Sequence, residues 1–273
     1  MRLFTHRIYH EPGETFTLYP LGDVHFGSGN CDVQAFDDTI MEIRQNPKAL
    51  WIGMGDMVES IAPNDKRWHA GGVDEKVVNL ASQDRIGDVY VEKLATKLRP
   101  IADKLICYGD GNHEATFNKH YYTNLSVRVL ESLERPEAYT GWGCLTRLAF
   151  SDGADHRTAI KVFHSHGWQG GRMDGAKVNE VRRLMAYVDA DIYLQGHSHS
   201  KFVIPQTRLD CNPSWTKLIA RQVYVAHTGS FLRTLQHDNV GYAEMAGYPP
   251  TTLGTVRFNI TPKRPENIVE AIT

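Results

Sequence analysis

The sequence contains few cysteines and no closely spaced cysteine pair. Its four cysteines, Cys31, Cys107, Cys144 and Cys211, are scattered along 273 residues without a Cys-x-x-Cys motif. Zinc knuckles and dithiol redox sites need such a pair, so both kinds of site are excluded. We expect the four thiols to be reduced and structural.

Long hydrophobic runs and an excess of charge of one sign are also lacking. Residues 1–7 contain no apolar core of a signal peptide, and no stretch approaches the length of a membrane span. We therefore expect a cytoplasmic protein without a membrane partner. The net charge of −2 gives no overall basic field for tight non-specific DNA binding, although a local basic cleft is compatible with it.

What the sequence does contain is a recurring arrangement, in which polar side chains of metal-binding types follow an apolar segment. The five instances are Asp23 and His25 after residues 16–21, Asp56 after 50–52, Asn112, His113 and Glu114 after 105–108, His164 and His166 after 160–163, and His197 and His199 after 191–195. At the ends of apolar strands, carboxylate, amide and imidazole groups would repel or stay unpaired without a cation between them. The sequence therefore predicts a metal site.

The mixture and number of these side chains indicate the kind of metal centre. Oxygen ligands and imidazoles without cysteine suit Mn, Fe, Zn, Ni or Mg, and argue against a thiolate-held structural zinc. Seven or eight ligands are too many for one ion. Two ions that share a bridging carboxylate fit the number, and such pairs lie about 3.5–4 Å apart in enzymes that displace groups at phosphorus. His197 and His199 would serve adjacent ions, because side chains two residues apart in extended backbone point the same way.

Helical periodicity separates the apolar segments. Apolar residues recur at helical spacing in three stretches, which are Phe36, Ile40 and Ile43; Ile86, Val89, Leu94 and Leu98 before Pro100; and Val178, Val181, Leu184, Met185 and Val188. Further strands are expected at residues 222–226 and 255–260. This alternation of strands and helices predicts an α/β fold, and no linker-like stretch divides the chain.

In their order along the chain, these motifs resemble those of a known family. Asp-x-His at 23–25, Gly-Asp at 55–56, Gly-Asn-His-Glu at 111–114, His-Gly at 166–167 and Gly-His-x-His at 196–199 resemble the calcineurin-like metallophosphoesterase superfamily, over residues 18–230. Residues 166–172, a helix and Gly-His-Ser-His are similar in particular to small members encoded by bacteriophages and prophages. The resemblance implies one domain, residues 1–273, with two mixed β-sheets flanked by α-helices in four layers and the active site at the carboxyl ends of the strands.

The resemblance also implies which residues act. The seven metal ligands are Asp23, His25 and His199 for one ion, Asn112, His166 and His197 for the other, and Asp56 as the bridge. Asn112 would also contact the substrate. In this superfamily a hydroxide between the ions attacks phosphorus, and the histidine after the asparagine, here His113, protonates the leaving oxygen.

Some assignments leave alternatives open. His166 is favoured over His164 as a ligand because Gly167 follows it. His164 would then contact a metal ligand without binding the metal itself. Glu59 is interpreted as the carboxylate that orients His113, with an exposed acidic residue as the alternative. Glu114 could serve the same end or lie at the surface.

Substrate contacts are indicated by loops. Arg172, in the glycine-rich residues 170–175, is interpreted as gripping the substrate phosphate, with a solvated arginine as the alternative. Residues 64–69, with Trp68, could stack on a nucleotide or only pack. Ser60 stands where the protein serine/threonine phosphatases have a phosphoryl-binding arginine, which argues against phosphoprotein phosphatase activity.

Together these assignments predict a hydrolase with two divalent cations, Mn first among them, that cleaves phosphodiester bonds in a nucleotide or nucleic acid. A phosphomonoesterase acting on small phosphates or nucleotides is one alternative. A binding scaffold that keeps the fold and little chemistry is the other. The intact ligand set and His113 argue against the scaffold, because a scaffold has no need of an acid histidine.

Overall fold

The described part of the chain forms two mixed β-sheets. The computed structural model describes residues 1–61, 72, 74, 85–153, 157–168, 173–212, 214–235, 237, 242–245, 247–263 and 267–273. The order of the first sheet is β1 (Arg2–Tyr9), β6 (Gly143–Ser151), β7 (Arg157–Ser165), β8 (Ile192–Gln195), β10 (Leu218–Ser230) and β11 (Gly254–Thr255), and β9 (Lys201–Cys211) also pairs with β10. The order of the second is β13 (Ile268–Ile272), β12 (Arg257–Thr261), β2 (Phe16–Leu21), β3 (Ala49–Gly53), β4 (Leu105–Gly109) and β5 (Tyr139–Gly141).

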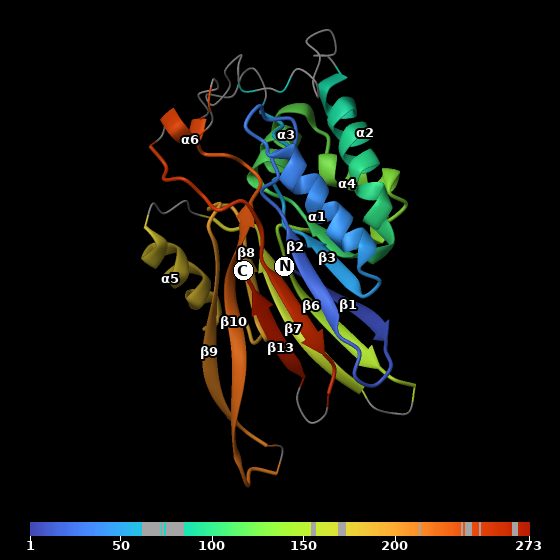
Figure 1. The fold of residues 1–273 in the computed structure, drawn as a ribbon, viewed down its shortest axis with the longest axis vertical. Helices are drawn as coiled ribbons and strands as arrows, with labels where there is room; N and C mark the ends of the chain where they lie inside the picture. The colour runs from blue at the N-terminus through green and yellow to red at the C-terminus, as the bar shows by residue number, and fades with distance from the viewer. Residues whose placement is uncertain are drawn as a thin grey trace.

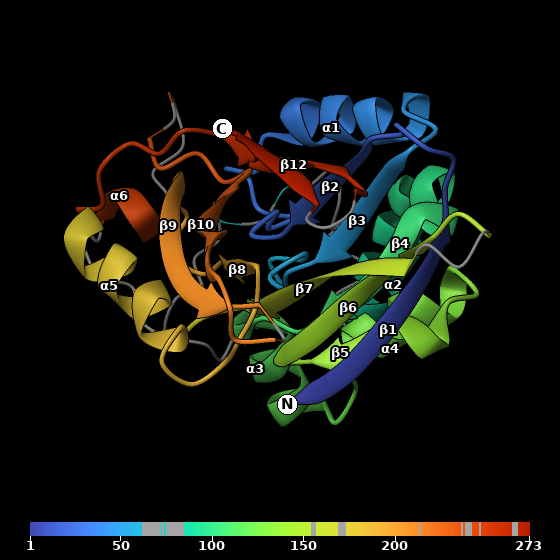
Figure 2. The same ribbon diagram turned by 90° about the horizontal axis from the view of Figure 1, so that it is seen from below.

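Helices cover the outer faces of both sheets. One apolar cluster joins α1 (Val33–Gln45), α2 (Ile86–Leu98) and α4 (Leu125–Ser132) to the second sheet, and another joins α5 (Asp174–Leu184) to the first. A third cluster fills the space between the sheets. Figures 1 and 2 show α5 on the opposite side of the molecule from α2 and α4. The predicted α/β class, two mixed sheets flanked by helices, is confirmed.

The described residues form four further helices. They are α3 (Asn112–Tyr121), α6 (Tyr242–Met245) and the 3₁₀ helices η3 (Arg99–Lys104) and η4 (Pro136–Ala138). No helix of the described residues combines the length and the apolar character that crossing a membrane requires.

The predicted helical periodicity corresponds to real helices. The buried side chains of α1 are Phe36, Ile40 and Ile43, and the helix begins where the Asp32 carboxylate accepts a hydrogen bond from the N–H of Ala35 at 3.0 Å. Helix α2 ends at Leu98, two residues before Pro100. Helix α5 ends at Leu184, earlier than the apolar pattern predicts.

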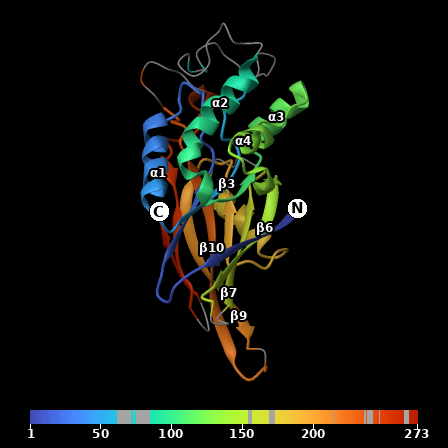
Figure 3. The same ribbon diagram turned by 90° about the vertical axis from the view of Figure 1, so that its right-hand side faces the viewer.

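The sheet topology explains why the polar segments meet. Strands β2, β3 and β4 are parallel neighbours in the second sheet, and β7 and β8 are parallel neighbours in the first. Carboxyl ends of parallel neighbours lie at the same edge of a sheet, and ligand sites of α/β folds form at that edge. The five apolar segments that precede metal-type side chains are these five strands. At the other end of the molecule, β9 and β10 project as a long hairpin, seen at the bottom of Figure 3.

Candidate metal centre

Loops after the five strands bring the seven predicted metal ligands together. Three groups of three side chains each have ligand atoms within 4.8 Å of one another, and two of these groups consist of predicted ligands alone, whereas the third is His25, Glu59 and His113. The first group is Asp23, His25 and His199, and the second is Asp56, His166 and His197. Asn112, at the first residue of α3, joins the second group through its side-chain oxygen.

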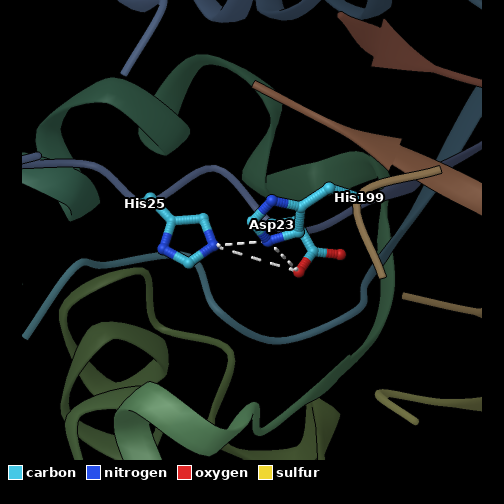
Figure 4. A group of neighbouring side chains, drawn as sticks. All are labelled: Asp23, His25 and His199. Carbon is cyan, nitrogen blue, oxygen red and sulfur yellow. Dashed lines mark hydrogen bonds and ion pairs between the residues drawn. The ribbon is translucent and has the colours of Figure 1, made fainter. Parts of the chain in front are cut away.

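The side chains of the first group lie close together in Figure 4, and Asp23 and His25 are buried whereas His199 is half-buried. The Nε2 atoms of His25 and His199 lie 3.1 Å apart, and His199 Nε2 lies 3.4 Å from Asp23 Oδ1. Asp23 Oδ1 is buried and has no hydrogen-bond partner within the described residues. A divalent cation fits here, because ligand atoms bound at about 2.1 Å to one tetrahedral ion lie about 3.4 Å apart.

The second group is held around the Asn112 side chain. Asn112 Oδ1 lies 3.0 Å from His166 Nε2 and 2.7 Å from His197 Nδ1. His166 Nε2 also lies 3.2 Å from Asp56 Oδ2. This mixture of two imidazoles, one carboxylate and one amide oxygen suits a borderline or hard divalent cation.

Asp56 belongs to the second group and also faces the first. Its Oδ2 atom is 3.2 Å from Nε2 of His166 in the second group and 3.9 Å from Nε2 of His25 in the first. Its Oδ1 atom accepts a hydrogen bond from the main-chain N–H of His113 at 2.8 Å. Asp56 therefore faces histidines of both groups, and its bridging role stays a prediction.

The electrostatics of the cluster favour a cation. Burial alone would raise the pKa of Asp56, but the neighbouring His166 and His113 hold it well below its usual value. Burial would conversely lower the pKa of His166, but Asp56 and Asp23 raise it to about 10, so a proton on this ring balances the carboxylates in the metal-free protein, and a bound cation would displace that proton. Burial lowers the pKa of His25, although the Glu59 carboxylate acts in the opposite direction. The lowered pKa favours a neutral imidazole, which metal binding requires.

The backbone at the cluster is left-handed at five of the seven ligands. The φ angles are 49° at Asp23, 52° at His25, 49° at Asp56, 67° at His197 and 56° at His199. Such angles are uncommon outside glycine and concentrate at functional sites. The extended backbone assumed above for His197 and His199 is therefore wrong. Their rings reach different groups because each residue turns the chain, not because they lie along one strand.

Glu114 is a buried support of the Asp56 loop, and neither sequence alternative described it fully. Its Oε2 atom accepts hydrogen bonds from the N–H groups of Asp56 at 3.0 Å and Gly111 at 2.9 Å. Its Oε1 atom accepts from Met57 at 2.8 Å and Val58 at 3.3 Å. Burial, with Asp56 and Asp110 nearby, raises the pKa of Glu114 to about 7. Its exposure is only 2%, so the surface alternative is wrong.

Glu59 contacts both His25 and His113, but through different atoms. Its carboxylate lies 2.8 Å from Nδ1 of His25, whereas its main-chain carbonyl forms a short hydrogen bond with Nδ1 of His113. A carbonyl can only accept, so Nδ1 of His113 donates, and Nε2 of His113 lies 4.0 Å from Asp56 Oδ2. The carboxylate of Glu59 thus supports a predicted ligand, while its backbone orients the predicted acid.

The two histidines of the fourth motif have separate surroundings. His166 lies in the second group, whereas His164 is buried between the sheets, 3.4 Å from Cys107 Sγ. Burial lowers the pKa of His164 to about 4. Trp142, which the sequence did not single out, packs edge-on to His166 with ring centres 5.6 Å apart.

Two predicted substrate contacts lie outside the described residues, namely Arg172 and the loop at 64–69 with Trp68. Ser60 is described and buried, with φ 34°.

Comparison with known proteins adds little about function. No protein-family model and no curated protein matches the chain. Among solved structures, a conserved uncharacterized protein and predicted phosphoesterase from Streptococcus pneumoniae is 11% identical, covering 95% of this chain and 90% of its own, with a TM-score of 0.35. Zinc-complexed Vps29 from Entamoeba histolytica is 11% identical, and the match covers 94% of this chain and 98% of the Vps29 chain, with a TM-score of 0.37. A metallophosphoesterase from Sphaerobacter thermophilus is 12% identical over 94% and 89%, with a TM-score of 0.38. Similarity at this level does not assign a family, so the functional argument depends on the site.

Proposed function

We propose that this chain is a metal-dependent phosphoesterase that hydrolyses phosphodiester bonds in a nucleotide or nucleic-acid substrate. The observation that carries the proposal is Asp56 Oδ2, placed within 4 Å of imidazole nitrogens from both ligand groups. Such an arrangement is what a bridging carboxylate between two divalent cations needs. We propose Mn²⁺ as the first candidate for both ions.

The protein side chains would divide the work. Asp23, His25 and His199 would hold one ion, and Asn112, His166 and His197 the other. Two such ions, when bound, supply Lewis-acid stabilisation of charge on phosphate oxygens and a water of lowered pKa. Asn112 would also contact the substrate.

His113 is proposed as the general acid. The main-chain carbonyl of Glu59 fixes its Nδ1 as a donor, which leaves Nε2 to carry or release the catalytic proton. His113 is 6% exposed and packs edge-on to His25, with ring centres 4.7 Å apart. A proton donated from Nε2 would neutralise the departing alkoxide oxygen.

The diester preference follows from the cationic groups available. A phosphomonoester carries a second negative charge, which enzymes commonly meet with arginine. Ser60 stands where a phosphoryl-binding arginine would be expected, and Arg172 is the remaining proposed clamp. A diester lacks this second negative charge and therefore needs fewer cationic contacts.

The test compares esters with matched leaving groups. Bis-nitrophenyl phosphate and nitrophenyl phosphate are hydrolysed with Mn²⁺, Ni²⁺, Zn²⁺ or Mg²⁺, alongside cyclic and linear nucleotides and labelled DNA and RNA. We expect a higher kcat/KM for the diester. A monoester preference of an order of magnitude or more would replace the diesterase by a phosphomonoesterase, and no hydrolysis with fully bound metal would favour a binding scaffold.

A further inference from the structure

His227 lies behind the loop that carries His197 and His199. It is a residue of β10, 1% exposed, and its strand pairs with β8 at Gln195 and with β9 at Phe202. Its Nδ1 atom is 2.7 Å from Ser198 Oγ, and its Nε2 atom is 3.3 Å from the main-chain carbonyl of Lys177 in α5.

These two contacts determine which ring nitrogen of His227 carries the proton. A carbonyl only accepts hydrogen bonds, so Nε2 donates to Lys177 and Nδ1 is the acceptor. The hydroxyl of Ser198 therefore donates to Nδ1. Burial lowers the pKa of His227 to about 4, which agrees with a neutral ring. The ring also packs on Phe202, with ring centres 5.0 Å apart, so it has little freedom to turn.

Ser198 is the residue between the two histidine ligands. His197 reaches the second ligand group and His199 the first, and both have left-handed φ angles, 67° and 56°. Such angles cost free energy and persist only where the surroundings impose them. The hydrogen bond from Ser198 to His227 is a side-chain contact that holds the loop at its middle.

A second contact holds the same loop from α5. The buried Lys177 donates from Nζ to Ser200 Oγ at 2.6 Å, one residue beyond His199. Lys177 thus contacts both His227, through its carbonyl, and the end of the loop, through its ammonium group. Helix α5 and strand β10 therefore both contact the loop that carries His197 and His199.

We propose that His227, acting through Ser198, is a positioning residue that sets the placement of His197 and His199 and so the affinity of both metal sites. The inference rests on the metal centre of the proposed function. Because one histidine of the loop belongs to each group, loss of the His227 contact weakens both sites together. Partners that orient metal-binding histidines typically change metal affinity by about 10- to 100-fold.

The test uses two variants that differ in one hydrogen bond. In His227→Asn the side-chain oxygen takes the place of Nδ1 and still accepts from Ser198, whereas His227→Gln reaches toward the Lys177 carbonyl and leaves Ser198 without its acceptor. Mn²⁺ binding to the full chain is measured by titration calorimetry, and Co²⁺ absorption reports on the coordination geometry. We expect His227→Gln and Ser198→Ala to weaken both sites by about 10- to 100-fold, and His227→Asn to stay close to wild type.

Matched controls separate this effect from general damage to the fold. His10 is also a buried histidine with Nδ1 next to a main-chain carbonyl, at 3.0 Å from Glu11, and with an edge-on phenylalanine, but it follows β1 at the far end of the sheet. His10→Gln and Ser126→Ala, a buried serine in α4, should leave Mn²⁺ affinity unchanged.

The outcomes distinguish the two proposals. A wild-type chain that binds no Mn²⁺ would overturn the proposed metal centre itself. Wild-type binding with unchanged affinity in folded Ser198→Ala and His227→Gln would overturn the positioning role alone. If His227→Gln fails to fold, Ser198→Ala decides, because it removes one hydroxyl and leaves the ring in place.

Discussion

The carboxylate of Glu114 accepts a hydrogen bond from the main-chain N–H of Asp56 at 3.0 Å. The same carboxylate bonds the N–H groups of Met57 and Val58 on one side and Gly111 on the other. It therefore fastens the loop after β3 to the start of α3. Two sequence motifs, Gly-Asp and Gly-Asn-His-Glu, are joined by a group that binds no metal in the proposed ligand set.

We predict that Glu114→Gln destabilises the metal-free protein by about 1–3 kcal/mol, because an amide offers one acceptor oxygen where the carboxylate offers two, and buried N–H groups then lose their partner. Urea unfolding with a chelator present measures this. Glu92→Gln, at an exposed glutamate of α2, serves as the control and should change the free energy of unfolding little. Equal stability of the two variants would show that the Glu114 contacts do not hold the loop.

Gly111 leaves no room for a side chain next to Asp56. A Cβ atom at this position would lie 2.1 Å from Asp56 Oδ1 and 2.2 Å from Asp56 N. We predict that Gly111→Ala costs about 1–3 kcal/mol, the usual range for overpacking, and also weakens Mn²⁺ binding because Asp56 must move.

The matched glycine is Gly175 in α5, where a Cβ atom would meet no atom of the described residues within 4 Å. Gly175→Ala should stabilise the protein by up to about 1 kcal/mol, since alanine is the better helix former. Thermal unfolding of both variants measures the contrast. A Gly111→Ala protein with wild-type stability and metal affinity would contradict the close packing at Asp56.

Sequence motifs predicted which residues meet, but not how the loops between them are held. Apolar strands and helical spacing identified β2, β3, β4, β7, β8, α1 and α2, because burial imposes a period on the sequence. The paths of residues 54–60 impose no such period. The sequence therefore did not show that Glu59 offers its carbonyl to His113 and its carboxylate to His25. The contact of His227 with Ser198 could not be read from the sequence, because it joins residues 29 apart.

The metal content follows from the number of ligands. We predict about two Mn²⁺ per chain at saturation, as two-metal sites require. Asp56→Asn should weaken both sites together, because its Oδ2 lies close to histidines of both groups and loses its charge. Elemental analysis and calorimetry of the same samples measure this. One equivalent in the saturated wild-type protein would eliminate the dinuclear centre.

The stability of the metal-free protein should fall in acid through His164. Its pKa is lowered by burial from 6.5 to about 4, so between these values the unfolded chain binds the proton more readily. The stabilisation is complete above pH 6.5 and is lost as the pH falls toward 4. The loss amounts to about 3 kcal/mol, since one pKa unit corresponds to about 1.4 kcal/mol.

His164→Gln removes this titration. The variant should show a shallower fall of the free energy of unfolding between pH 6.5 and 4 than wild type, measured by urea unfolding in the presence of a chelator. Parallel curves for the two proteins would mean that His164 has the same pKa in the folded and the unfolded chain.

His113 is the residue whose substitution should separate metal binding from catalysis. His113→Ala should retain both Mn²⁺ ions, because the His113 ring belongs to neither proposed ligand set, and should lower kcat by about 10²–10⁴-fold, the range for a general acid. The decrease should be smaller for a nitrophenolate leaving group than for an alkoxide, since nitrophenolate departs without help from a proton. Turnover and metal content are measured on the same samples. His120→Ala, a histidine later in the same helix α3, is the control and should leave both unchanged.

Loss of Mn²⁺ from His113→Ala would instead make His113 a ligand, in line with its closeness to His25 and Glu59. Equal decreases for good and poor leaving groups would argue that His113 holds the substrate and does not protonate it.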